Sequence, residues 1–322
     1  MQILVTGALG KVGAATVTEL LSAGHTVTGC DLAPPVYEAV AHPPGDFGAH
    51  YMQADLTDAG DAFAVVRGAD VVIHCAALPE PTRNPPQAVF RNNVLATFNV
   101  AEAAVRMGVD RVVHVSSETV TGMAFAERPF HAPVAPIDEE LASRPQDPYA
   151  LAKVFGEQLM DAMVARSDVT AVSIRPSWVQ WESNYERSLR PWLSDPFGSE
   201  ASVSFWSYID VYDLAHGLRL AAENASPGHE AAYIVSADNG AGKPLRELVA
   251  HHFGEAVTVA DGLSREDAGG ISYAKAERLF GYRPAHSWRD YLAQDGTLLD
   301  APRERLARGE TSVQRGRAAL RG

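Results

Sequence analysis

Thr6-Gly7-Ala8-Leu9-Gly10-Lys11-Val12-Gly13 is the stretch of sequence that decides the fold. It follows the apolar run Ile3-Leu4-Val5 and precedes a helical period from Val12 to Ala23, so it is predicted to join a strand to a helix. Its glycines permit a tight turn, close approach of a pyrophosphate and close packing of helix on strand. Free N–H groups at the start of the helix favour an anion there. The expected dinucleotide-binding residues are Gly7, Gly10, Lys11, Val12 and Gly13.

Asp31 ends the second predicted strand, Thr26 to Cys30. A carboxylate at this place accepts hydrogen bonds from the adenosine ribose of NAD and repels the 2′-phosphate of NADP. Because no Lys or Arg follows in residues 32–35, NAD is the expected cofactor. Asp55 and Leu56 follow the third predicted strand and are expected under the adenine, with an N-cap role for Asp55 as the alternative.

Apolar, β-branched runs alternate with helical periods through the first half of the chain. Further strands are predicted at 71–74, 112–115 and 169–174, and further helices at 89–107 and 148–165. Strands that read as continuous apolar runs between helices indicate a parallel sheet covered on both faces. The predicted class is α/β, a Rossmann-type doubly wound sheet.

The composition of the sequence changes after Arg175-Pro176. Four of the five tryptophans lie in residues 177–208, and smaller α/β elements follow. We therefore expect a dinucleotide-binding domain at 1–174 and a smaller α/β substrate domain at 175–322, with some segments returning to the main sheet.

Tyr149 and Lys153 are four residues apart on a predicted helix, so both side chains leave the same face. A free tyrosine titrates near 10, and a lysine cation one turn away is expected to lower the pKa of Tyr149. Such a tyrosine can take a proton from an alcohol or give one to a carbonyl oxygen. This is half of a hydride-transfer reaction, and a nicotinamide supplies the other half.

Bulk composition limits the partners of the chain. Its 322 residues are 46% hydrophobic, with a net charge of −13 and no Lys/Arg cluster in the body of the chain, so nucleic acid is not an expected partner. No apolar run approaches the roughly 18 residues of a membrane span, and the N-terminus does not resemble a signal peptide. Cys30 and Cys75 are expected to be buried free thiols, which fits a reducing cytoplasm, and no metal-ligand spacing is present.

The C-terminal tail is the basic part of the chain. It is expected to be a solvated helix or a frayed end. The arginines that make it basic are Arg303, Arg305, Arg308, Arg315, Arg317 and Arg321.

In order, these motifs resemble an extended short-chain dehydrogenase/reductase of the NAD-dependent epimerase/dehydratase type. The resemblance extends over nearly the whole chain. The residues that carry it are the glycine motif, Asp31, Asp55-Leu56, His74-Cys75-Ala76-Ala77, Asn93, Ser116-Ser117, Tyr149 with Lys153, Arg175-Pro176, Tyr208 to Asp213, and Leu279 to Pro284.

The resemblance implies roles for residues around the Tyr149–Lys153 pair. Ser117 would hydrogen-bond the substrate oxygen beside Tyr149, and Lys153 would also bind the nicotinamide ribose. Ala76, Ala77 and Leu78 would line the cofactor, and Asn93 would support the site or simply pack. His74 is expected to be a packed residue rather than a catalyst, and Ser116 is expected to face the structure or the nicotinamide.

Departures from the family pattern narrow the substrate. Glu118-Thr119 stands where 4,6-dehydratases carry two acids, which disfavours dehydration because that reaction needs both an acid and a base. Trp178 and Trp181-Glu182 replace residues expected to hold a nucleotide diphosphate. Residues 177–187 look closer to uronate dehydrogenases and related sugar oxidoreductases.

Three further residues are candidate substrate contacts. Arg187, after Asn184-Tyr185, could hold a substrate carboxylate or be an ordinary surface arginine. Trp178 could stack on a sugar or fill core. Glu118 is expected to contact the substrate beside Ser117.

The expected activity is NAD-dependent hydride transfer at a secondary hydroxyl or ketone of a sugar or sugar acid. An epimerase of a nucleotide sugar is the alternative, because it shares the catalytic groups, and a 4,6-dehydratase is less favoured. A non-catalytic NAD-binding sensor is disfavoured because Ser117, Tyr149 and Lys153 are all present. The resemblance also implies a homodimer through a four-helix bundle of the helices at 89–107 and 148–165.

Overall fold

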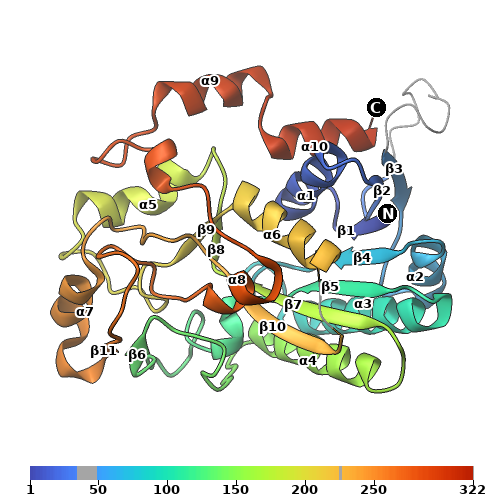
Figure 1. The fold of residues 1–322 in the computed structure, drawn as a ribbon, viewed down its shortest axis with the longest axis horizontal. Helices are drawn as coiled ribbons and strands as arrows, with labels where there is room; N and C mark the ends of the chain where they lie inside the picture. The colour runs from blue at the N-terminus through green and yellow to red at the C-terminus, as the bar shows by residue number, and fades with distance from the viewer. Residues whose placement is uncertain (35–48, 225–226, 322) are drawn as a thin grey trace.

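The computed structural model describes residues 1–34, 49–224 and 227–321. Its centre is a parallel sheet of seven strands in the order β10-β7-β5-β4-β1-β2-β3 (Figure 1). The order reverses at β1, which creates a crevice at the carboxyl ends of β1 and β4. The strands are β1 Gln2–Thr6, β2 Thr26–Asp31, β3 Ala49–Gln53, β4 Val71–His74, β5 Arg111–Val115, β7 Thr170–Pro176 and β10 His229–Ile234.

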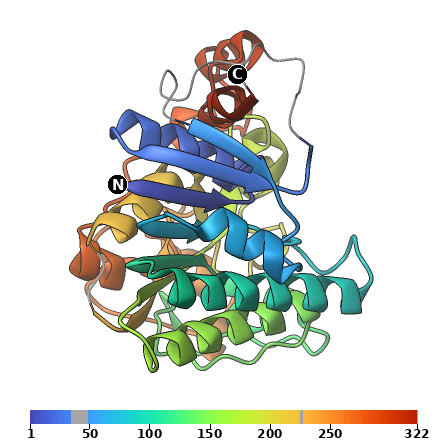
Figure 2. The same ribbon diagram turned by 90° about the vertical axis from the view of Figure 1, so that its right-hand side faces the viewer.

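Helices cover both faces of this sheet. On one face α2, α3 and α4 pack together, and on the other α1 packs with α6 (Figure 2). The helices are α1 Lys11–Ser22, α2 Ala59–Val66, α3 Pro86–Met107, α4 Pro148–Val164 and α6 Val211–Asn224. The predicted α/β fold with a doubly wound parallel sheet is confirmed.

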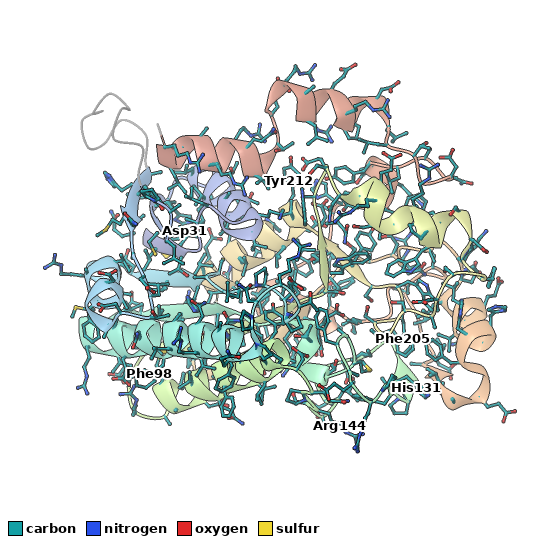
Figure 3. The ribbon with its side chains drawn as sticks, turned by 180° about the vertical axis from the view of Figure 1, so that it is seen from behind. Asp31, Phe98, His131, Arg144, Phe205 and Tyr212 are labelled. Atoms are coloured by element: carbon teal, nitrogen blue, oxygen red, sulfur yellow. The ribbon has the colours of Figure 1, made fainter. Side chains whose placement is uncertain are left out.

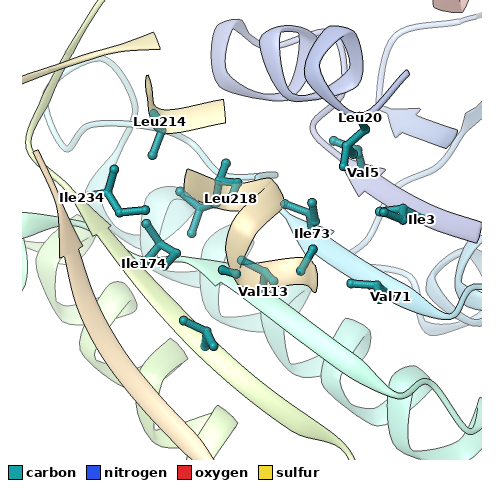
Figure 4. Close-up of a cluster of buried hydrophobic side chains, with 14 of the residues drawn as sticks. Ile3, Val5, Leu20, Val71, Ile73, Val113, Ile174, Leu214, Leu218 and Ile234 are labelled. Atoms are coloured by element: carbon teal, nitrogen blue, oxygen red, sulfur yellow. The ribbon is translucent and has the colours of Figure 1, made fainter. Parts of the chain in front are cut away.

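Alternate residues of each strand supply the two cores. Ile3 and Val5 of β1 face the cluster that includes Leu214 and Leu218 of α6 (Figure 4), whereas Leu4 faces α2, α3 and α4. Successive side chains of a strand point to opposite faces, so a strand with both faces covered must be apolar throughout. This is the physical reason why the strands read as unbroken apolar runs.

Smaller secondary-structure elements, most of them from the second half of the chain, lie beside the carboxyl edge of the sheet. Strand β8 (Trp178–Gln180) pairs with β9 (Tyr208–Asp210), and β6 (Val134–Ala135) pairs with β11 (Thr258–Val259). Helices α5 (Tyr185–Ser194), α7 (Leu245–Phe253) and α8 (Ala274–Phe280) complete this region. Because β10 and α6 belong to the main sheet and its cover, the two halves share one core; a boundary at residue 175 stays a prediction.

The C-terminal segment forms α9 (Asp300–Arg308) and α10 (Ser312–Arg321), and α10 docks on α1 (Figure 1). Gly316 permits this contact, because a Cβ there would lie 1.8 Å from the backbone oxygen of Ala14. The Thr18 hydroxyl also donates to the Ser312 carbonyl at 2.7 Å. The expectation of a solvated or frayed tail is therefore wrong for α10.

Helices α3 and α4 leave apolar side chains on the surface. Figure 3 shows Phe98 on the outer side of α3. Phe98 is 43% exposed, and Leu95 of α3 with Leu151 and Phe155 of α4 are exposed as well. These residues lie on the two helices for which a bundle between subunits was expected.

Both cysteines are free; Cys30 is buried, and Cys75 is only half-buried. Of the helices in the described ranges, none combines the length and apolar character needed to cross a membrane. The same residues contain no group of three or more His, Cys, Asp or Glu side chains suited to a metal ion.

Candidate active site

Helix α4 carries the central residues of the site. Its N-cap is Asp147, whose carboxylate accepts hydrogen bonds from the backbone N–H groups of Tyr149 and Ala150, both at 2.9 Å, and Pro148 occupies the first turn. The cap fixes Tyr149 in the first turn, at the end of the helix near the carboxyl edge of the sheet. Lys153 follows one turn later on the same face.

Tyr149 is buried, and burial raises the pKa of its phenol to about 12. A hydrogen bond with the Ser117 side chain lowers this pKa, while the nearby charges of Asp147 and Glu118 raise it. The prediction that Lys153 lowers the pKa of Tyr149 below its ordinary value is therefore wrong for this structure. The cost of removing a phenolate from water exceeds the favourable interactions around it.

Lys153 places its ammonium group between strand β5 and the Tyr149 ring. Nζ donates to the backbone oxygen of Val115 at 2.6 Å, and it lies 5.6 Å from the centre of the Tyr149 ring. Burial lowers the pKa of Lys153 to about 8, against smaller raising effects from Cys75 and Glu157. The side chain is therefore a cation at neutral pH, and its hydrogen bond to strand β5 holds it next to Tyr149.

Ser116 and Ser117 follow β5, and their side chains have different partners. The Ser116 hydroxyl donates to Glu157 at 2.7 Å, so the Ser116 side chain points into the protein, towards α4. Ser117 caps the short 3₁₀ helix Glu118–Thr121, and its oxygen accepts from the backbone N–H of Thr119 at 3.2 Å. Ser117 is thereby fixed with its hydroxyl beside Tyr149.

Arg175 is committed to a carboxylate of the protein itself. Its guanidinium forms a bidentate pair with Glu157, with Nε–Oε1 at 2.8 Å and Nη2–Oε2 at 2.7 Å, and both side chains are largely buried. A buried bidentate pair holds both groups in one geometry. Glu157 thus ties Ser116, α4 and the end of β7 together.

Glu118 is a half-buried carboxyl next to Ser117. Burial raises its pKa to about 7, against lowering effects from the side chains of Ser177 and Ser204. It is therefore a mixture of acid and carboxylate at neutral pH, able to donate or accept a proton.

Trp206, two residues after Ser204, has φ of 59°, and Phe205 has φ of 49°. Positive φ is costly for such bulky residues and is typical of constrained functional segments.

The glycine-rich loop fits a dinucleotide. A Cβ on Gly7, where φ is +64°, would lie 2.8 Å from the backbone of Ala76, and one on Gly13 would lie 2.2 Å from the Gly7 oxygen. Gly7 therefore packs with its backbone directly on the backbone of Ala76, and Gly13 does the same on Gly7. Helix α1 starts at Lys11 after Gly10, without a capping side chain or an acidic residue in its first turn. Its first N–H groups are left for an anion.

Asp31 lies beside this loop at the end of β2 (Figure 3). Its Oδ2 accepts from the backbone N–H of Leu9 at 3.0 Å, and Oδ1 accepts from Leu32 at 2.8 Å. The carboxylate thus connects the end of β2 to the glycine-rich loop and retains lone pairs for a further donor. The contact of Asp31 with a ribose stays a prediction.

Asp55 and Leu56 follow β3 as expected, but Asp55 does not cap α2. Its Oδ1 accepts from the backbone N–H and the hydroxyl of Thr57, at 2.9 and 2.7 Å, and the N-cap of α2 is Asp58. The alternative role of Asp55 as an N-cap is therefore wrong. Leu56 is buried, and its carbonyl accepts from Asn99 at 2.9 Å.

The loop after β4 is held by Asn93 of α3. The Asn93 amide accepts from the backbone N–H of Leu78 at 2.8 Å and donates to the Leu78 carbonyl at 3.0 Å. Asn93 therefore fixes the loop, which contains Ala76 and Ala77, beside Gly7. The Thr6 hydroxyl accepts from the N–H of Ala76 at 3.1 Å and strengthens this join.

His74 has the packed role that was expected. It is buried, and its ring nitrogens contact the hydroxyls of Thr6 at 2.8 Å and Thr97 at 3.1 Å. Burial lowers its pKa to about 3, so the ring is neutral.

The expected substrate residues of the second half lie on β8 and α5. Trp178 remains 43% exposed and packs edge-on against Trp192, with ring centres 5.4 Å apart. It is therefore not a core residue. Arg187 is exposed in the first turn of α5, where Asn184 and Tyr185 are buried. Trp181 instead packs under Lys11, whose Nζ lies 4.3 Å from the ring centre.

Two features of the site were missed at the level of sequence. Glu157 continues the series of Tyr149 and Lys153 at a spacing of four, a signal that could have been used. Arg317 of α10 donates from Nε to the carbonyl of Leu9 in the glycine-rich loop at 2.8 Å. The sequence separation of 308 residues left no local signal for this contact.

Comparison with known proteins agrees with this geometry. A 3β-hydroxysteroid dehydrogenase/Δ5→4-isomerase of Mycobacterium tuberculosis is 32% identical over 73% of this chain, but the match spans only 64% of that protein. An L-arabinose 1-dehydrogenase (NAD(P)+) of Haloferax volcanii is 29% identical, covering 74% of this chain and 89% of the relative.

Among solved structures, a mutated uronate dehydrogenase superposes with a TM-score of 0.62 at 22% identity, covering 98% of this chain and 93% of that one. This likeness shows a shared fold. The model of the NAD-dependent epimerase/dehydratase family matches residues 3–235, well over half of the sequence. The chain belongs to the NAD-dependent epimerase/dehydratase family.

Proposed function

We propose that this protein is an NAD-dependent oxidoreductase that oxidises a secondary hydroxyl of a sugar or sugar acid, or reduces the matching ketone. The observation that carries the proposal is the buried Tyr149, with the Ser117 side chain beside it and the Lys153 cation behind it, at the sheet edge that also holds the glycine-rich loop. Family membership and the likeness to a sugar dehydrogenase support it. A location in the cytoplasm stays a prediction.

The cofactor is NAD, held at the glycine-rich loop, the Asp31 carboxylate and the Ala76–Leu78 wall. When bound, NAD supplies the acceptor or donor of hydride. The first N–H groups of α1 and Lys11 face its phosphates, and Asp31 accepts from the adenosine ribose hydroxyls. Asn93 acts as a positioning residue because it holds the Leu78 loop rather than the reacting atoms.

Tyr149 moves the proton of the reaction. In reduction its phenol, protonated at neutral pH because its pKa is raised to about 12, donates to the substrate oxygen. Oxidation is the reverse of this step: the phenolate form of Tyr149 takes the hydroxyl proton, and the nearby positive charge of Lys153 favours that form. Ser117 orients the substrate oxygen, and Glu118 contacts a neighbouring group.

An epimerase of a nucleotide sugar is the alternative, because it would use the same hydride and proton steps. The exposed Trp178, where a diphosphate-holding residue was expected, favours a smaller substrate. A panel of sugars, uronates, a hydroxysteroid and nucleotide sugars, followed by NADH absorbance, tests the proposal. Absence of NADH formation with every free sugar and uronate would refute it.

Replacing Tyr149 tests the proton transfer. Tyr149→Phe keeps the ring but removes the hydroxyl, so turnover is expected to fall by roughly 10²-fold or more, the usual scale of general acid–base catalysis. Binding of NAD, measured by calorimetry, should change little. Lys153→Met should lose both turnover and cofactor affinity. Turnover that persists in the phenylalanine variant contradicts the assignment.

Asp31 is expected to set the choice between NAD and NADP. Its carboxylate would repel a 2′-phosphate, so kcat/KM with NAD should exceed that with NADP, and Asp31→Ala should narrow the gap. The matched control is Asp110→Ala, because Asp110 is an exposed carboxylate just before β5, at the opposite edge of the sheet from the crevice. Equal use of both cofactors by the unmodified protein would contradict this role.

Arg187 and Glu118 are expected to recognise an acidic substrate. Arg187 is exposed in the unbound protein, but a charged hydrogen bond that the bound substrate buries contributes roughly 1.5–3 kcal/mol, so Arg187→Ala should raise KM for a uronate about ten-fold or more. Arg190→Ala is the control, since Arg190 lies one turn along α5 and pairs with Glu186 at 3.4 Å. An equal KM in both variants argues against a carboxylate contact, and turnover of only the nucleotide-linked sugar would favour the epimerase.

The pH dependence supplies a second arm of the same test. The pKa of Glu118 is about 7, so below this pH the carboxyl is neutral and can donate to a substrate carboxylate. Above it the two carboxylates repel, and KM for a uronate should rise. The KM of a neutral sugar should not follow this change, and Glu118→Gln should abolish it. The same pH profile in Glu118→Gln would exclude Glu118 as its cause.

The exposed apolar residues of α3 and α4 are expected to form a homodimer interface, with a four-helix bundle across a two-fold axis. Light scattering at micromolar concentration should give the mass of a dimer. The double variant Phe98→Asp and Phe155→Asp should be a monomer. Phe125→Asp, at an exposed phenylalanine outside both helices, should leave the dimer intact. A monomeric unmodified protein would refute the proposal.

A further inference from the structure

Helix α10 reaches the glycine-rich loop from the other end of the chain. Gly316 lies against the backbone of Ala14, and Leu320 packs on Gly29, where a Cβ would lie 2.7 Å from Leu320 Cδ2. Val313 joins a small cluster with Ala14 and residues of α6. The helix is therefore seated on α1 by a close backbone contact at Gly316 and on β2 by the Leu320 side chain over Gly29.

This docking places Arg317 at the loop. Its Nε donates to the Leu9 carbonyl at 2.8 Å, while the Leu9 N–H donates to Asp31 at 3.0 Å. Leu9 is thereby held on both sides, by a cation at its oxygen and a carboxylate at its nitrogen. The terminal Nη groups of Arg317 form no ion pair with any carboxylate in the part of the chain that the structure describes.

Other cations gather at the same place. Partial burial lowers the pKa of Lys11, and the charges of Arg317 and Arg83 lower it further, so each of these two arginines lies close enough to repel Lys11 at the start of α1. Lys11 packs over Trp181 and, within the described residues, also has no carboxylate partner. Arg83 pairs with Glu80, with Nε–Oε1 at 3.2 Å, whereas Lys11 and Arg317 are like charges without a carboxylate partner among the described residues, and an anion bound between these two removes the cost of bringing them together.

We propose that Arg317 of the C-terminal helix α10 is part of the cofactor site: it positions the glycine-rich loop through Leu9 and adds positive charge for the pyrophosphate of the dinucleotide. This rests on NAD as the cofactor. The site is then built from both ends of the chain, since the loop begins at Gly7 and its extra cation comes from the last turns of the protein.

Calorimetry with NAD, ADP and adenosine tests this role without turnover. Arg317→Gln should raise the dissociation constants of NAD and ADP about ten-fold, as expected for a lost charged hydrogen bond, and leave that of adenosine unchanged. It should also flatten the dependence of NAD affinity on salt, because one phosphate contact is lost. Arg317→Lys, which keeps the charge, should restore part of the affinity.

Arg315→Gln is the matched control, because Arg315 is exposed on α10 and lines a different pocket, with Tyr212 and His286. It should leave all three affinities unchanged. Gly316→Val supplies a second variant, because its side chain would meet the Ala14 oxygen and undock α10, so NAD and ADP affinity should fall at least as far as in Arg317→Gln.

Three results would overturn the proposal. An equal loss for adenosine in Arg317→Gln would mean that Arg317 only shapes the loop. Unchanged NAD affinity in that variant would remove Arg317 from the site while leaving the activity proposal intact. Failure of the unmodified protein to bind NAD would refute both.

Discussion

Close packing of backbone against backbone around Gly7 is the constraint on which the rest of the structure depends. The carboxyl ends of β1 and β4 meet here, and there is no room for a side chain between Gly7 and Ala76. Because these segments lie in contact, the start of α1, the Asp31 carboxylate and the Leu78 loop surround one crevice. Asn93 and Thr6 hold the loop by hydrogen bonds to its backbone. The position proposed for the cofactor therefore follows from the absence of side chains at the glycines of the loop. The polar groups surround the crevice beside these glycines.

Removal of water decides the chemistry of the neighbouring groups. Burial raises the pKa of Tyr149 and Glu118 and lowers the pKa of Lys153, so each group is shifted towards its neutral form. Arg175 and Glu157 keep their charges because they neutralise each other in a bidentate pair. The site thus separates a fixed ion pair, which holds α4 against β5 and β7, from groups whose protonation burial has shifted; of these, Glu118 and Lys153 have pKa values of about 7 and about 8, near neutral pH. This separation is typical of sites in which a scaffold and a reaction centre share one small volume.

The sequence predicted the parts of this arrangement that depend on local spacing. The glycine motif between strand and helix, the apolar runs of the parallel strands, and the Tyr149–Lys153 face all follow from residues a few positions apart. It failed where distant segments meet. The direction of the Tyr149 pKa depends on burial by the whole site, and the commitment of Arg175 to Glu157 depends on how α4 lies across β7. Docking of α10 depends on Gly316 fitting against Ala14, which no periodicity reveals.

The distribution of charge connects these observations. The chain carries a net charge of −13, which disfavours the approach of an anionic dinucleotide or sugar acid. Many of its arginines are engaged with acids or backbone carbonyls, as Arg175, Arg219 and Arg246 are. Lys11 and Arg317 differ in having no acidic partner among the described residues: Arg317 donates to the Leu9 carbonyl, Lys11 packs over Trp181, and both lie next to the first N–H groups of α1. A local excess of positive charge in an acidic protein directs anions to one place. In this chain that place is assembled only when the last helix folds back onto the first.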